Sequence, residues 1–89
     1  MVNPLQLHAF RALANHRRLQ ILAQLNRQGA TSLTDLSRDI RLSVKSTHKH
    51  LAQLAQAGFV ASERRGLTAY YRLEPQHNLA RLLLQILRR

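Results

Sequence analysis

Residues 34–73 constrain the fold of this chain more than any other part of its sequence. Two short segments with apolar residues at helical spacing are separated by a turn at residues 40–42, and Ser43 can cap the second segment. Gly58 ends that segment, and two β-type segments follow directly. Two helices at a tight turn, followed by a β-hairpin, are the elements of a winged helix-turn-helix.

The rest of the chain predicts three more helices around this unit. Asn3 and Asn15 can cap two helices before it, and Gly29 stops the second of these. The predicted helices cover about residues 4–14, 16–28, 33–40, 43–57 and from 76 onward, and the predicted strands cover 59–63 and 69–73. The expected fold is therefore mainly α with a β-hairpin wing, in the order α-α-α-α-β-β-α.

The chain is strongly basic. Its 89 residues hold 14 Lys and Arg against four Asp and Glu, which gives a net charge of +10. Twelve of the 14 cations are Arg, whose guanidinium fits phosphates and base edges better than a Lys ammonium does. A solvated basic surface is the plain alternative, but an excess of this size is typical of polyanion binding. We expect double-stranded DNA as the partner.

The composition also excludes several classes of protein. There is no cysteine, which rules out disulfides and thiolate metal sites. No apolar run approaches the ~18 residues of a membrane span, and the N-terminus lacks the apolar core of a signal peptide. We expect one domain over residues 1–89, in the cytoplasm, without membrane contact. No nucleophile–base pair, Gly-rich phosphate loop or carboxylate pair suggests an enzyme.

The helix after residue 42 divides into an apolar and a polar face. Its predicted buried stripe is Thr47, Leu51, Leu54 and Ala55. In a helix-turn-helix the N-terminal half of this helix enters the major groove, where Lys and His donate to guanine or phosphate and Val contacts a thymine methyl. A solvated helix face is the alternative. The residues expected to contact DNA here are Arg41, Ser43, Val44, Lys45, Ser46, His48 and Lys49.

Arg64 and Arg65 lie at the predicted tip of the hairpin. Two adjacent arginines there suit a narrow, electronegative minor groove or its phosphates. A turn that only aids solubility is the alternative, and we favour contact with the groove.

Three segments together resemble the ArsR/SmtB repressors, which are dimeric winged-helix regulators. They are LANHRRLQILAQL at Leu13–Leu25, LSVKSTHKHLAQLAQAGFV at Leu42–Val60, and RRGLTAYYRL at Arg64–Leu73. The resemblance covers nearly the whole chain. It implies a dimer built from the first and last helices, a DNA-reading helix at Ser43–Gly58, and a hairpin that acts as the wing.

The metal sites of that family do not carry over to this sequence. One family site needs Cys-x-Cys where this chain has Leu33, Thr34 and Asp35. Another pairs carboxylates with His on the last helix, where this chain has His77 alone. His50 is better interpreted as a packed or capping histidine behind the DNA-reading face. We expect neither a metal nor a cofactor.

Apolar side chains on the terminal helices predict a homodimer, because a core of this size is marginal alone. The expected interface residues are Leu5, Phe10, Leu79, Leu82, Leu83 and Ile86. Together these features predict a sequence-specific, homodimeric transcriptional repressor that does not respond to metal. The alternative is an architectural or protein-interaction module that uses a winged helix without sequence preference.

Overall fold

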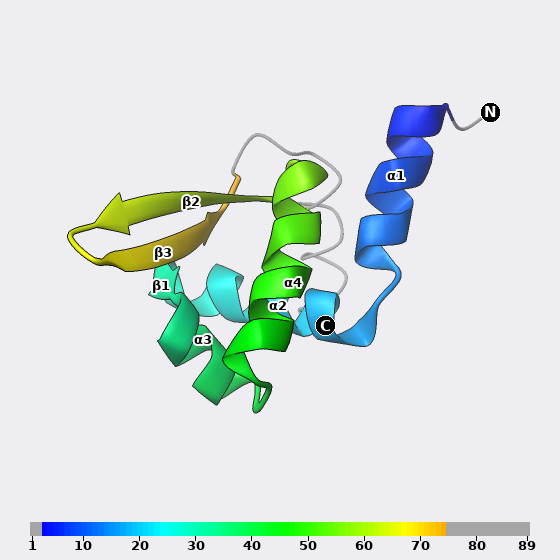
Figure 1. Cartoon of the computed structure of the whole chain (residues 1–89). Coiled ribbons are helices and arrows are strands. Elements are labelled where there is room, and N and C mark those ends of the chain that lie inside the picture. Colours follow the sequence, from blue (N-terminus) through cyan, green and yellow to red (C-terminus); the bar gives the residue numbers. More distant parts are fainter. Residues whose placement is uncertain (1–2, 75–89) are drawn as a thin grey trace.

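The structure, a computed structural model, describes residues 3–74. Helices α2, α3 and α4 pack together, α1 lies against α2 and α4, and the β2–β3 hairpin projects from the helices as a wing (Figure 1). The elements are α1 Pro4–Leu13, α2 His16–Gln28, β1 Thr31–Ser32, α3 Leu33–Asp39, α4 Val44–Gln56, β2 Val60–Arg65 and β3 Thr68–Leu73. This arrangement confirms the mainly helical winged helix-turn-helix fold.

The helix ends follow the local signals in the sequence. Asn3 accepts a hydrogen bond from the Gln6 backbone N–H at 2.8 Å, and the Gln6 side chain accepts one from the Asn3 backbone N–H at 2.9 Å. Asn15 caps α2 by accepting from the Arg18 backbone N–H. Gly29 ends α2 with φ of 76°, a conformation that costs glycine little. The caps satisfy backbone donors that a helix leaves unpaired.

The turn between α3 and α4 sets where the second helix begins. Ser43 Oγ accepts from the Ser46 backbone N–H at 3.0 Å, and Thr47 Oγ1 donates to the Ser43 carbonyl at 2.8 Å. Arg41 in the turn has φ of 57°, a left-handed conformation that non-glycine residues seldom adopt. The cap and this single left-handed residue reverse the chain between the two helices.

A short strand between α2 and α3 is missing from the predicted element order. β1 pairs antiparallel with β3, with Thr31 opposite Tyr71 and Ser32 opposite Tyr70, so the sheet order is β1-β3-β2. Two residues are too few to show the alternation that marks a strand. The strand exists because β3 returns to this point from far along the chain, and Ser32 also caps α3.

The hairpin strands are longer than predicted. Arg64 and Arg65 are the last residues of β2 and pair with Ala69 and Thr68, so they do not lie at the tip. The loop consists of Gly66 and Leu67 alone. Gly66, with φ of 63°, supplies the positive φ that a two-residue hairpin turn of this kind needs at its first position.

The core lies between the helices and the root of the sheet. From α4 it receives Thr47, Leu51 and Leu54, all completely buried. The prediction was wrong for Ala55, which is exposed because it lies one position beyond the buried stripe. The other buried apolar residues are Ala12, Leu13, Ile21, Leu22, Leu25, Leu36, Ile40, Phe59, Val60 and Tyr71. The final helix predicted from Gln76 lies outside the described residues.

The buried stripe of α4 yields a test of the core. Leu54→Ala removes a completely buried side chain and leaves a cavity, so we expect it to lower the free energy of unfolding by about 2–5 kcal/mol. The neighbouring exposed change Ala55→Gln should alter it by less than about 0.5 kcal/mol. Urea denaturation at a fixed protein concentration measures both, and equal losses would contradict the observed orientation of α4.

Candidate nucleic-acid interface

Helix α4 presents a polar face to solvent, opposite its buried stripe. Lys45, His48 and Lys49 are exposed, and Val44 is 48% exposed despite being apolar. Ser43 is exposed as well, whereas Ser46 is half-buried and its backbone N–H donates to the cap. The first two turns of α4 therefore bring together most of the residues that the sequence predicted to meet DNA.

The charges on this face are available to a polyanion. Within residues 3–74, no ion pair joins Arg41, Lys45 or Lys49 to a carboxylate. The acidic side chains of α3, Asp35 and Asp39, both pair with Arg38, at 3.3 and 3.6 Å. Arg38 thus offsets part of their negative charge, and phosphates approaching the start of α4 meet lysines without a carboxylate partner.

The two wing arginines point to opposite faces of the hairpin, because successive side chains in a strand alternate. Arg65 Nη2 lies 3.3 Å from the Glu63 carboxylate, and its guanidinium stacks 4.6 Å from the centroid of the Tyr70 ring. Arg64 Nη1 makes a long contact of 3.5 Å with the Leu67 carbonyl. The two arginines therefore do not form a single basic tip. Arg65 contacts Glu63 on β2 and Tyr70 on β3, whereas Arg64 lies on the other face of the hairpin.

His50 lies on the flank of α4 next to Arg18 of α2. It is half-buried, and its Nδ1 is 3.4 Å from Arg18 Nη1. Partial burial, followed by the positive charges of two arginines on α2 and of Lys49, lowers the pKa of His50 below its usual value. The neutral ring can then accept a hydrogen bond from a guanidinium. His50 therefore belongs to the packing behind the exposed polar face of α4, as expected.

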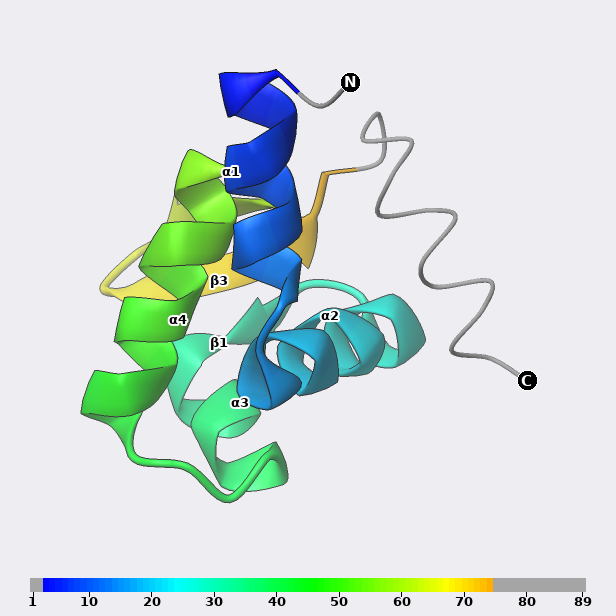
Figure 2. The same cartoon turned by 90° about the vertical axis from the view of Figure 1, so that its right-hand side faces the viewer.

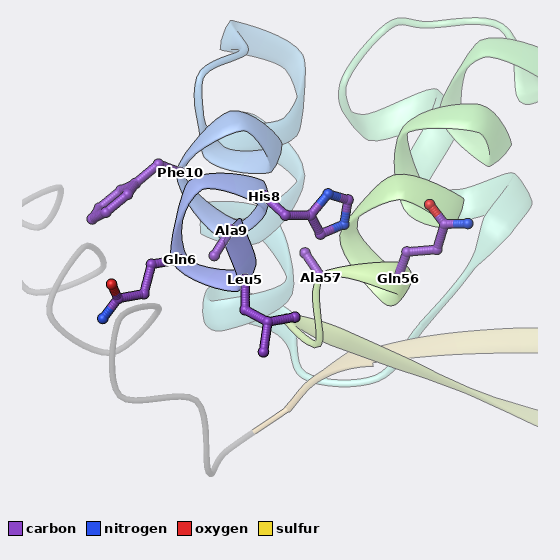
Figure 3. Close-up of a pocket in the computed structure, with 7 residues that line it drawn as sticks. All are labelled: Leu5, Gln6, His8, Ala9, Phe10, Gln56 and Ala57. Carbon is purple, nitrogen blue, oxygen red and sulfur yellow. The ribbon is translucent and has the colours of Figure 1, made fainter. Parts of the chain in front are cut away.

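Helix α1 keeps apolar side chains in solvent. Leu5 is 82% exposed and Phe10 47%, and Leu7, which is not among the predicted interface residues, is exposed as well. A groove of about 430 Å³ runs between α1 and the C-terminal end of α4. In Figure 3, His8 points from α1 toward Gln56, whereas Phe10 projects from the opposite side of α1. The other residues expected at a dimer interface, Leu79, Leu82, Leu83 and Ile86, lie outside the described part of the chain.

No helix within residues 3–74 has both the length and the apolar composition needed to cross a bilayer. Across the same residues, His, Asp and Glu side chains form no group of three that could hold a metal ion.

The fold and the exposed lysine-bearing helix define the class as winged helix-turn-helix transcriptional regulators. Residues 15–62 match the family model described as bacterial regulatory protein, arsR family. That match spans more than half of the chain, from the start of α2 to β2, and the chain belongs to the ArsR family. Members of this family are transcriptional regulators and not enzymes.

Named relatives agree with this assignment. The arsenic resistance transcriptional regulator ArsR1 of Pseudomonas putida is 34% identical over 67 residues, which are 75% of this chain and 52% of the relative. The transcriptional activator HlyU of Vibrio cholerae is 38% identical over 63 residues, 71% of this chain and 57% of HlyU. The chain thus spans about half the length of the curated relatives it matches.

Solved structures show the same fold. A structure of V. cholerae HlyU superposes with a TM-score of 0.83 at 30% identity, covering 94% of this chain and 89% of HlyU. The homodimeric winged helix-turn-helix DNA-binding domain of a possible ArsR-family regulator from Mycobacterium bovis superposes with a TM-score of 0.82 at 30% identity. That alignment covers 92% of this chain and 74% of the domain.

Proposed function

We propose that this chain is a sequence-specific DNA-binding repressor, which acts in the cytoplasm as a homodimer and forms one domain over residues 1–89. The first two turns of α4 carry the proposal, because Lys45, His48 and Lys49 are exposed there above a completely buried inner face. Such a helix enters the major groove as a rigid unit. Its lysines donate to guanine or to phosphate, and Val44 meets thymine methyls. Arg41, Ser43 and Ser46 complete this surface beside the start of the helix.

The wing adds contacts that do not depend on sequence. Arg64 and Arg65 lie on opposite faces of a projecting hairpin, so we assign them to phosphates or to the rim of a minor groove. Repression follows from occupancy, since a protein bound across a promoter excludes polymerase by its volume. The relative HlyU of V. cholerae is named a transcriptional activator. A reporter gene under the bound promoter therefore tests whether this chain represses or activates transcription.

The proposed dimer joins α1 with the C-terminal segment. Exposed Leu5 and Phe10 would be covered by Leu79, Leu82, Leu83 and Ile86, and the M. bovis neighbour is described as homodimeric. Burying a Leu side chain contributes roughly 1.5–3 kcal/mol, which a small domain needs. Two-fold symmetry then requires pseudo-palindromic DNA with half-sites about 34–36 Å apart. Selection of bound DNA from a random pool, followed by footprinting, tests this; binding without sequence preference would favour an architectural module.

If α4 contacts bases and the wing contacts the DNA backbone, alanine substitutions in the two elements should weaken DNA binding in different ways. Lys45→Ala should weaken the free energy of binding to the selected DNA by about 1–3 kcal/mol and to random DNA by much less. A base contact is lost only where the matching base exists. Arg64→Ala should weaken both and reduce the slope of log affinity against log salt by about one. Binding isotherms at several salt concentrations measure these effects, and equal losses for Lys45→Ala on both DNAs would assign that lysine to phosphate.

Charges placed on α1 should prevent dimerisation. We expect the double variant Leu5→Glu, Phe10→Glu to sediment as a monomer while it keeps its helical circular dichroism, because carboxylates would be buried at the proposed interface. The control variant Leu67→Glu introduces one carboxylate at a wing residue that is 97% exposed, and this variant should remain dimeric. A dimeric double variant would place the interface elsewhere.

Metal should not alter DNA binding. The chain has no cysteine, and the groups that zinc prefers do not converge within residues 3–74. We expect equimolar zinc and EDTA to leave the dissociation constant for the selected DNA unchanged in fluorescence anisotropy. Stoichiometric zinc binding that weakens DNA binding tenfold or more would show that the protein is metal-responsive.

A further inference from the structure

One arginine side chain joins three helices. Arg18, in the first turn of α2, donates through Nε to the Ala12 carbonyl at 2.5 Å and through Nη2 to the Arg11 carbonyl at 3.2 Å. Its Nη1 donates to Gln53 Oε1 and lies 3.4 Å from His50 Nδ1. The acceptors belong to the last turn of α1 and to one flank of α4. A single guanidinium thus spans the junction of α1, α2 and α4.

The chemistry of this junction suits arginine. The last carbonyls of a helix lack partners within it and carry the negative end of its dipole, so a guanidinium there is favourable. Its planar fork holds several acceptors in fixed directions, which a Lys ammonium does not do. Partial burial and the neighbouring Arg18 lower the pKa of His50, which favours the neutral ring beside the cation.

Apolar packing alone does not fix α1 against α4 at this point. A hollow of about 250 Å³ lies between the two helices, lined by His8, Arg11, Ala12, Arg18, Gln53 and Gln56. Figure 2 shows α1 running alongside α4, and most of the side chains between them here are polar. The hydrogen bonds of Arg18 therefore add directional contacts between α1 and α4 to the burial of Ala12 and Leu13 in the core.

Direct contact with DNA phosphate is the competing role for an arginine in such a protein. Most N–H groups of Arg18 already donate to the acceptors named above, and a phosphate would have to break those bonds. Gln53, which Arg18 contacts, lies one turn beyond Lys49 and two turns beyond Lys45, toward the C-terminal end of α4 and away from the first two turns proposed to enter the groove. The geometry favours a role within the protein.

We propose that Arg18 is a positioning residue that sets the separation of the two DNA-reading helices in the dimer. The proposal rests on the proposed function, in which α1 lies at the dimer interface and α4 enters the major groove. In that arrangement the path from one α4 to the other crosses the α1–α4 junction in each protomer. Arg18 holds that junction, so it determines which half-site spacing the dimer accepts.

The test compares DNAs that differ only in spacing. The wild-type protein, Arg18→Gln and the charge-matched control Arg11→Gln are titrated with the selected DNA and with versions whose half-sites are two base pairs closer or farther apart. Arg11→Gln removes the same charge but keeps the carbonyl that Arg18 contacts. We expect Arg18→Gln to bind the selected spacing at least tenfold more weakly than the control and the altered spacings with little further loss. Its salt slope should equal that of the control, because no phosphate contact is removed.

Two more variants distinguish the geometry of the Arg18 contacts from the charge of Arg18 and from an effect on folding. Arg18→Lys keeps the charge without the fork, and we expect it to lose spacing preference as Arg18→Gln does. Gln53→Ala removes the other end of the contact at an exposed position, so it tests the proposal even if Arg18 variants unfold. Circular dichroism and sedimentation confirm a folded dimer in each case.

Three results would overturn the proposal. A salt slope lower by about one than that of Arg11→Gln would make Arg18 a phosphate contact. If Arg18→Gln lost the same affinity at every half-site spacing, Arg18 would not set the separation of the DNA-reading helices. Wild-type spacing preference in Arg18→Lys would show the same. Wild-type protein that shows no spacing preference at all would instead contradict the proposed function, so the two failures are distinguishable.

Discussion

Burial of the inner face of α4 is the contact on which the rest of the structure depends. Thr47, Leu51 and Leu54 have no exposure to solvent, and the Thr47 hydroxyl is satisfied by the Ser43 carbonyl within the same helix. This anchoring fixes the rotation of α4 about its axis. Because the helix cannot roll, Lys45 and Lys49 are held in solvent without needing contacts of their own. The exposed basic face of α4, which we propose meets DNA, is thus a consequence of core packing.

Local signals made most of this fold predictable. Asn3, Asn15 and Ser43 act through hydrogen bonds to residues three positions away, so their effects can be inferred from the sequence alone. The same holds for the apolar spacing of α4, although the predicted stripe was one residue too wide at Ala55. The exposed polar face of α4 follows from that spacing, because the polar face of a helix lies opposite its buried stripe.

The features that could not be predicted depend on residues distant in sequence. β1 is a strand only because Tyr70 and Tyr71 return beside Thr31 and Ser32. The sequence predicts Arg64 and Arg65 at the hairpin tip, whereas both pair within β2. Gly66 indicates that a turn is near but does not show at which residue each strand ends. The three-helix contact of Arg18 joins residues up to 35 positions apart, and a basic pair at a helix start carries no sign of it.

The position of β3 at the centre of the sheet has a consequence for how such a protein can change. Two-stranded ribbons are marginal on their own, but here β3 is paired on both sides at its root and carries the buried Tyr71. The base of the hairpin therefore packs with the helical core, whereas the Gly66–Leu67 loop projects into solvent. Loop tips of this kind tolerate substitution and insertion. Substitutions or insertions in this loop can therefore change the reach and the charge of the wing while α4 keeps its place.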